Sequence, residues 1–208
     1  GNYVLTNSGI TYSSVTTTAK ITPASLSISA VGVDKVYDGT TSGSVNLSVT
    51  GLKGSDQVSG TYTSASFADA NVGSAIPLTV TGLGITTGGS TVLANYTVNS
   101  SASATANITR APLTVTVANA TMVYGDAYPN FTYTTSGWVN ATELANAATL
   151  LTGVQLVASA INAGTHTGGI TASGGVTRNY SINYVPGNLV ITPATLTATL
   201  MNSAKVVG

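Results

Sequence analysis

The sequence repeats itself, and this repetition restricts the possible folds more than any other feature. Three stretches align without gaps: ITPASLSISAVGVDKVYDG from Ile21, ITRAPLTVTVANATMVYGD from Ile108, and ITPATLTATLMNSAKVVG from Ile191. Their starts lie about 85 residues apart along the chain. A period of this length indicates a tandem array of small modules, whereas the rungs of a parallel β-helix repeat at roughly 20 to 30 residues.

A second signature supports this division. An Asn-Tyr pair followed by β-like sequence occurs as NYVL at Asn2, NYTV at Asn95 and NYSI at Asn179. A weaker match pairs DANVGSAIPLTVTG from Asp69 with AINAGTHTGGITAS from Ala160. We therefore predict the C-terminal part of one module (1–23), two complete modules (24–110 and 111–194) and the first strand of another (195–208). Because half a module cannot bury its apolar face, we expect a segment of a longer array.

Apolar and hydroxyl residues alternate along much of the chain, which is typical of strands with one buried face. The alternation is seen in four sets: Leu26, Ile28 and Ala30; Val45, Leu47 and Val49; Leu113, Val115 and Val117; Leu196, Ala198 and Leu200. Near the end of the second complete module, two such runs flank Pro186-Gly187, which predicts a hairpin with a type II turn.

One stretch departs from this pattern. Asn140 lies three residues before Glu143, the spacing of an N-terminal capping box, and Ala- and Leu-rich sequence follows. The predicted fold is therefore mostly β: small modules of about 85 residues, β-grasp-like or immunoglobulin-like sandwiches, in a rod, with at most one short helix near 141–149.

Charge is scarce, and this excludes several functions. The 208 residues include six Lys or Arg and six Asp or Glu, with no net charge and no cysteine. A nucleic-acid partner would need a basic surface that such a chain does not have. The sequence has no apolar run near the roughly 18 residues that span a bilayer, so we expect no membrane insertion by this segment.

The ordered motifs carry a family resemblance. KVYDGTT from Lys35, followed by NVG, NYT and ITRAPL, closely resembles the YDG-type repeat of large bacterial surface adhesins and haemagglutinin-like proteins. MVYGDAYP from Met122, followed by NYSINYVPGNLVITPATL, resembles their companion MBG repeat of the YGX type. The resemblance implies an extracellular location at a bacterial cell surface, a role as spacer or binding module, and no catalytic residues. Val207 departs from the motif, since Tyr37 and Tyr124 stand at the matching positions.

The residues of these motifs are predicted to be structural. Recurring tyrosines indicate core packing, while Asp-Gly pairs favour turns because Asp bonds its own backbone and Gly tolerates positive φ. The motif residues are Tyr37, Asp38, Gly39, Tyr124, Gly125, Asp126, Asn95, Tyr96, Asn179 and Tyr180.

Few residues are available for chemistry. The single histidine, His166, lies in the glycine-rich stretch AGTHTGG and has no catalytic motif around it. Asp34 and Asp38 are weak calcium candidates, because carboxylates are hard oxygen ligands, yet their spacing matches no known calcium loop. We therefore predict no enzyme activity, no catalytic residue and no cofactor.

Three functions are open at this point. The first is a structural stalk segment of an extracellular adhesin or surface fibre, whose partners are neighbouring modules of the same chain. The second is an adhesive module that binds surface glycans or matrix through stacked aromatic side chains. The third is a filament subunit, assembled from like subunits by strand complementation.

Overall fold

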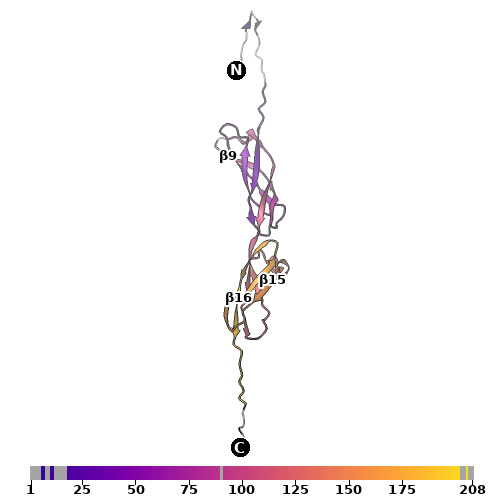
Figure 1. The fold of residues 1–208 in the computed structure, drawn as a ribbon. Helices are drawn as coiled ribbons and strands as arrows, with labels where there is room; N and C mark the ends of the chain where they lie inside the picture. The colour runs from indigo at the N-terminus through magenta and orange to yellow at the C-terminus, as the bar shows by residue number, and fades with distance from the viewer. Residues whose placement is uncertain (1–5, 8–9, 12–17, 90, 202–204, 206–208) are drawn as a thin grey trace.

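The computed structural model describes residues 6–7, 10–11, 18–89, 91–201 and 205. The Asn-Tyr copy at residues 2–5 and the motif departure at Val207 lie outside the described residues. Two β modules lie end to end, and the chain leads in at one end through residues 18–23 and out at the opposite end through residues 193–201 (Figure 1). Strands dominate both modules, which confirms the predicted mostly-β fold.

The first module consists of two main sheets and a small two-stranded sheet. One sheet has the order β10-β3-β5, the other has the order β4-β11-β8-β7, and β6 pairs with β9. The elements are β3 (Ala24–Gly32), β4 (Lys35–Val36), β5 (Val45–Thr50), β6 (Gln57–Thr61), β7 (Ser64–Phe67), β8 (Gly73–Thr81), β9 (Gly84–Gly88), the 3-10 helix η1 (Leu93–Asn95), β10 (Tyr96–Val98) and β11 (Ser101–Thr109). Before them, β1 (Thr6–Asn7) pairs with β2 (Ile10–Thr11).

The second module repeats this plan. Its sheets have the orders β14-β12-β17 and β13-β18-β16-β15. The elements are β12 (Ala111–Val117), β13 (Ala120–Val123), β14 (Tyr133–Ser136), α1 (Ala141–Ala145), α2 (Ala147–Leu150), β15 (Thr152–Ala158), β16 (Gly164–Val176), β17 (Tyr180–Val185) and β18 (Gly187–Thr192). The two helices follow β14, the third strand of their module, whereas in the first module β6 follows the third strand, β5.

The opening segment of each module crosses from one sheet to the other. In the first module β3 pairs in parallel with β10, and β4 then pairs in parallel with β11 of the opposite sheet. In the second module β12 pairs in parallel with β17, and β13 with β18. Each module is thus a two-layer sandwich whose opening segment belongs to both layers, an arrangement that matches the immunoglobulin-like alternative better than β-grasp.

The alternating pattern is visible in the burial of side chains. Leu26 and Ile28 of β3 are buried, as are Leu113 and Val115 of β12, while the hydroxyl side chains between them face outward or lie half-buried. The third copy of the pattern behaves differently. Leu196 is 95% exposed, and residues 193–201 form no strand.

The predicted helix is present but interrupted. Asn140 caps α1, because its Oδ1 accepts a hydrogen bond from the Glu143 backbone N–H at 2.9 Å. The helix breaks at Asn146, whose backbone leaves the helical region (φ −101°, ψ 15°), and α2 begins at the next residue.

The prediction of a hairpin at Pro186-Gly187 is wrong. β17 and β18 are consecutive in sequence, but they belong to opposite sheets. The chain crosses between layers at Pro186, and Gly187 is required there for close approach rather than for a turn. A Cβ at Gly187 would lie 2.5 Å from the Ala118 carbonyl oxygen.

Candidate functional site

The most elaborate arrangement of side chains lies where the two modules meet. A single residue, Arg110, separates β11 of the first module from β12 of the second. One cluster of buried side chains continues across this boundary, and it includes Tyr37 and Ile108 on one side and Leu113 and Tyr180 on the other. The modules therefore share a hydrophobic core instead of being joined by a linker alone.

Two tyrosines from different modules share one carboxylate. The Tyr37 hydroxyl donates a hydrogen bond to Glu143 Oε1 at 2.5 Å, and the Tyr180 hydroxyl donates to Glu143 Oε2. The Val139 backbone N–H in turn donates to the Tyr180 hydroxyl at 3.0 Å. We call Tyr37, Tyr180 and Glu143 the tyrosine joint. Charge-assisted hydrogen bonds of this kind are stronger than those between neutral groups.

The tyrosine rings are also packed against one another. The Tyr37 and Tyr180 ring centroids are 5.5 Å apart with an interplanar angle of 79°, and Trp138 meets Tyr180 at 4.9 Å and 72°. Edge-to-face contacts of this geometry add to the hydrophobic contribution of burial. Tyr180 therefore lies between an aromatic ring of each module.

The backbone holds each member of the joint in position. Tyr37 follows β4, and its backbone N–H donates to the Thr109 carbonyl at 2.8 Å. Glu143 lies in the first turn of α1, which Asn140 caps. Gly39 has φ +76°, and a Cβ there would meet Asn140 Nδ2 at 3.2 Å. Glycine at this turn thus satisfies both the left-handed backbone and the close approach of the second module.

A second set of contacts lies beside the joint. Asn179 Oδ1 accepts from the Val72 backbone N–H at 3.1 Å, and Asn179 Nδ2 donates to Asn71 Oδ1 at 2.8 Å. Further out, Arg178 and Asp69 form an exposed ion pair with 3.6 Å between Nη2 and Oδ2. Hydrogen bonds from Asn71 lower the pKa of Asp69, with a smaller contribution from Arg178.

Burial raises the pKa of Tyr37, and the hydrogen bond to Glu143 raises it further. The pKa of Tyr180 is raised strongly for the same two reasons, in the same order. Both hydroxyls are therefore protonated donors across the physiological pH range, which the shared carboxylate requires.

The predicted motif residues fall into two groups. Tyr37, Tyr96 and Tyr180 are buried, as their recurrence predicts. Tyr124 departs from the expectation, because its side chain is 51% exposed at the far end of the second module. Asp38-Gly39 and Gly125-Asp126 form turns after their strands, and both glycines have positive φ.

The calcium candidates are engaged in other contacts. Asp34 accepts from the backbone and side-chain N–H groups of Asn107, which lower its pKa. Asp38 pairs with Lys35 at 2.7 Å; burial opposes its ionisation most, but bonds from Lys35 and Thr40 outweigh this and lower its pKa. Within the described ranges, no three His, Asp or Glu side chains gather as a metal site would require.

His166 is also accounted for, since its Nε2 lies 2.8 Å from the Asn162 carbonyl oxygen. This contact ties the histidine to its own turn, four residues earlier in the chain. The structure therefore places His166 in a structural hydrogen bond and gives it no carboxylate partner among the described contacts.

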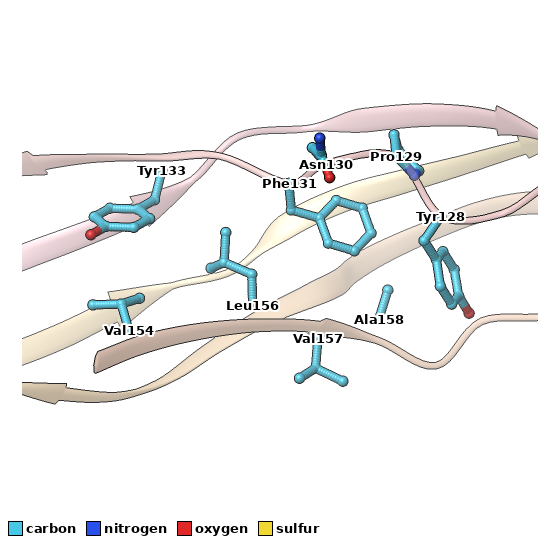
Figure 2. A pocket seen from close by; sticks show the side chains of 9 residues that line it. All are labelled: Tyr128, Pro129, Asn130, Phe131, Tyr133, Val154, Leu156, Val157 and Ala158. Carbon is cyan, nitrogen blue, oxygen red and sulfur yellow. The ribbon is translucent and has the colours of Figure 1, made fainter. Parts of the chain in front are cut away.

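An open hollow lies on the second module, away from the boundary between the modules. It has a volume of about 630 Å³ and is open to solvent. Figure 2 shows the segment 128–133 running along β15, with Tyr128, Phe131 and Tyr133 spaced along it. The Tyr128 and Phe131 rings are tilted against each other with centroids 5.9 Å apart, and the Tyr128 hydroxyl donates to the Ala160 carbonyl. Its lining holds no ionisable residue other than the two tyrosines.

The sequence does not predict the place of three members of the boundary. It predicts Glu143 as a capping residue only, Asn71 as part of a weak repeat match, and Trp138 as one of the aromatic side chains that could stack on a sugar. One signal was available for Glu143, since it is the single glutamate of the chain. Its pairing with two recurring tyrosines could not be inferred, because the tyrosines come from different modules.

These features define a class: tandem β-sandwich modules joined end to end through a shared core. Residues 22–106 match the family model of the YDG domain, and residues 113–190 match that of the MBG domain (YGX type). The chain thus contains a YDG module followed by an MBG module, both non-catalytic repeat-type domains. Neither a curated protein nor a solved structure matches it. The exact bounds 24–110 and 111–194 stay predictions.

Every helix within the part of the chain that the structure describes is short, and none is long and apolar enough to cross a bilayer.

Proposed function

We propose that this chain is a structural stalk segment of an extracellular bacterial surface protein, in which modules placed end to end form a rod. The observation that carries the proposal is the buried cluster that continues from the YDG module into the MBG module. Repeat proteins whose neighbours share an interface gain stiffness and stability from each added unit. The family of both modules supports the location at a cell surface.

The connection between the modules supports a rigid rod. A flexible spacer needs several unpaired residues between its domains. Here Arg110 alone separates two strands, and its Nε donates to the Arg178 carbonyl oxygen at 3.4 Å. The tyrosine joint and the Asn71–Asn179 contact then fix the rotation of one module about the other. A stalk needs this stiffness in order to hold a distal domain away from its base.

Two measurements test the stalk function. Small-angle X-ray scattering of the whole chain should give the cross-section and length of a rigid rod, and a screen of glycans, matrix proteins and cells should give no binding. A flexible two-bead scattering profile would overturn the rod, whereas a reproducible ligand would favour the adhesive function.

An adhesive module is the second candidate, and the aromatic hollow of the MBG module favours it. Aromatic side chains spaced along an open groove are a common platform for sugar rings. If this function is right, a glycan array should yield a specific signal that is lost in Tyr128→Ala and Phe131→Ala. The filament subunit is a third proposal; it predicts that the purified chain polymerises.

A further inference from the structure

The N-terminal end of the YDG module repeats half of the tyrosine joint. The Tyr96 hydroxyl donates to Asp56 Oδ2 at 2.6 Å, and the Lys53 backbone N–H donates to the Tyr96 hydroxyl at 3.0 Å. The same roles are filled in the MBG module by Tyr180, Glu143 and Val139. Tyr96 and Tyr180 also occupy the same position in the Asn-Tyr signature. We call Tyr96, Asp56 and Asn95 the YDG socket.

The C-terminal end of the MBG module repeats the other half. The Tyr124 backbone N–H donates to the Thr192 carbonyl at 2.8 Å, as that of Tyr37 donates to Thr109. The environment of the two side chains differs, since Tyr37 is 7% exposed and Tyr124 is 51% exposed. The module that follows Tyr37 covers its side chain. Tyr124 makes the same backbone hydrogen bond, but no module in the described residues covers its side chain.

Apolar side chains around the YDG socket lack a cover as well. Ile21 is 96% exposed, although Ile108 and Ile191, at the same position of the repeat, are 1% and 2% exposed. Both buried isoleucines lie in the last strand of a module, so the repeat gives Ile21 the matching position in a module that would precede YDG, although Ile21 lies in no strand of this structure. Lys53 matches Val139, so the residue before it, Leu52, matches Trp138. Leu52 is also exposed. A solvent-open hollow of about 460 Å³ lies here, lined by Ile21, Lys53, Asp56, Asn95 and Tyr96 among others.

We propose that the YDG socket receives the tyrosine-bearing turn of a like module standing before it, so that one kind of joint recurs at successive boundaries. The incoming tyrosine donates to Asp56 as Tyr37 donates to Glu143, and the asparagine that follows this tyrosine later in its module pairs with Asn95 as Asn71 pairs with Asn179. This inference rests on the proposed stalk function and names the partner as another module of the same kind. The YDG socket and the turn that carries Tyr124 each match one half of the YDG–MBG boundary. This match favours a like module over a soluble ligand as the occupant of the socket.

A fused chain tests the proposal directly. ITPA at residues 191–194 repeats ITPA at residues 21–24, so residues 1–194 of one copy can be joined to residues 25–208 of a second. This places a complete MBG module before a complete YDG module in natural register. Tyr124 of the first copy then faces Tyr96 of the second, and Asn162 faces Asn95. Both modules of each copy are retained, and only residues 195–208 of the first copy and 1–24 of the second are left out.

Spin-label distances report whether the new boundary is ordered. The chain has no cysteine, so two introduced cysteines carry the labels. Val157→Cys in the first copy and Thr97→Cys in the second flank the new boundary. Ser66→Cys and Ser181→Cys in the natural chain flank the existing boundary at the matching positions and give the reference. All four sites are exposed strand residues. We expect a single narrow distance for both pairs.

Removing the incoming tyrosine should change the result. Tyr124→Ala in the first copy should shift the new pair from one narrow distance to a broad distribution, and Tyr96→Phe in the second copy should broaden it less. The matched control, Tyr133→Ala in the first copy, removes an exposed tyrosine away from the boundary and should leave the distance narrow. Because Tyr124 is exposed, its removal should not unfold the module.

Two outcomes would overturn the socket. One is a broad distribution for the new pair while the reference pair is narrow, and the other is a narrow distance that Tyr124→Ala does not alter. Either result refutes docking through the socket but leaves the rod-shaped scattering of the natural chain, and hence the stalk function, intact. A ligand found in the glycan screen would instead refute the stalk function without bearing on the spin-label distances.

Discussion

The YDG and MBG modules have the same framework of strands. They differ in the contacts that their recurring tyrosines make at the ends of each module. In both, a tyrosine follows the opening segment and a second tyrosine follows an asparagine. The MBG module bonds its second tyrosine to Glu143 on a capped helix, whereas the YDG module uses Asp56 on a turn. Tyr37 is buried and Tyr124 is exposed. The MBG module helps to bury Tyr37 at the YDG–MBG boundary, so the burial of this tyrosine depends on the module that follows it.

The largest effect is expected at a repeat position whose side chain is buried in one copy of the repeat and exposed in another. Leu113→Ala should lower the free energy of unfolding by about 2–5 kcal/mol, because Leu113 is fully buried in the cluster shared by both modules. Urea unfolding followed by the fluorescence of Trp138, the single tryptophan, reports this loss.

The matched control is Leu196→Ala, at the same position of the third copy. Its side chain is exposed, so the free energy of unfolding should change by less than about 0.5 kcal/mol. Equal losses for Leu113→Ala and Leu196→Ala would contradict the assignment of the shared core.

The carboxylates of the two modules give the next largest contrast. Glu143→Ala leaves two half-buried tyrosine hydroxyls without their acceptor, and we expect a loss of about 1.5–3 kcal/mol. Asp56→Ala removes the acceptor of a single hydroxyl and should cost less, about 0.5–1.5 kcal/mol. Chemical denaturation of both variants measures the difference. The free energy of unfolding of Glu143→Gln, which keeps one acceptor oxygen, should lie between those of the wild type and Glu143→Ala. Similar losses for Glu143→Ala and Asp56→Ala would show that the tyrosine joint adds no stability beyond that of a single tyrosine–carboxylate pair.

The tyrosine joint should weaken at high pH. The pKa values of Tyr37 and Tyr180 are raised in the folded chain, so their contribution to stability is complete below the unfolded value of about 10 and is lost as the pH rises through the folded values. The free energy of unfolding should therefore fall above about pH 10. Ultraviolet absorbance of tyrosinate tracks the ionisation. In Tyr37→Phe/Tyr180→Phe this decline should shrink, and an unchanged decline would assign it to other groups.

The smallest effect is expected at the exposed edge of the boundary. Arg178→Ala introduces the residue that the YDG module carries at the matching position, Ala94. The Arg178 and Asp69 side chains are 68% and 51% exposed, so the ion pair should contribute little to the free energy of unfolding, and less in high salt. Thermal unfolding at two salt concentrations measures it. A loss as large as that of Glu143→Ala would mean that charge, not the tyrosine joint, holds the boundary.

Much of the framework could be predicted from the sequence, because it follows from local rules. Alternation of Leu and Val with Ser and Thr gave the buried faces of β3 and β12, and the spacing of Asn140 and Glu143 gave the start of α1. The repeat itself gave the number and order of the modules. Each of these signals is contained in a few neighbouring residues or in a fixed repeat period, so the sequence pattern is sufficient to predict the structure there.

The contacts between layers and between modules could not be predicted in this way. The residues around Pro186 read as a hairpin because alternation identifies strands but does not say which sheet each strand joins. Recurrence of tyrosine predicts core packing, which is right for Tyr37 and wrong for Tyr124, since the period of the sequence does not reveal whether a neighbouring module covers a side chain. Glu143 acquires its role only when two segments more than a hundred residues apart meet.

The parallel pairing of opening and closing strands sets how each module responds to tension. Pulling the ends of the chain apart slides β4 past β11 and β13 past β18, so their hydrogen bonds are loaded in shear and must break together instead of one after another. The parallel pairings of the MBG module span Ala111–Thr116 and Ala120–Val123, and those of the YDG module span Ala24–Leu26 and Lys35–Val36. Under force we therefore expect the YDG module to yield first and the MBG module to keep its length.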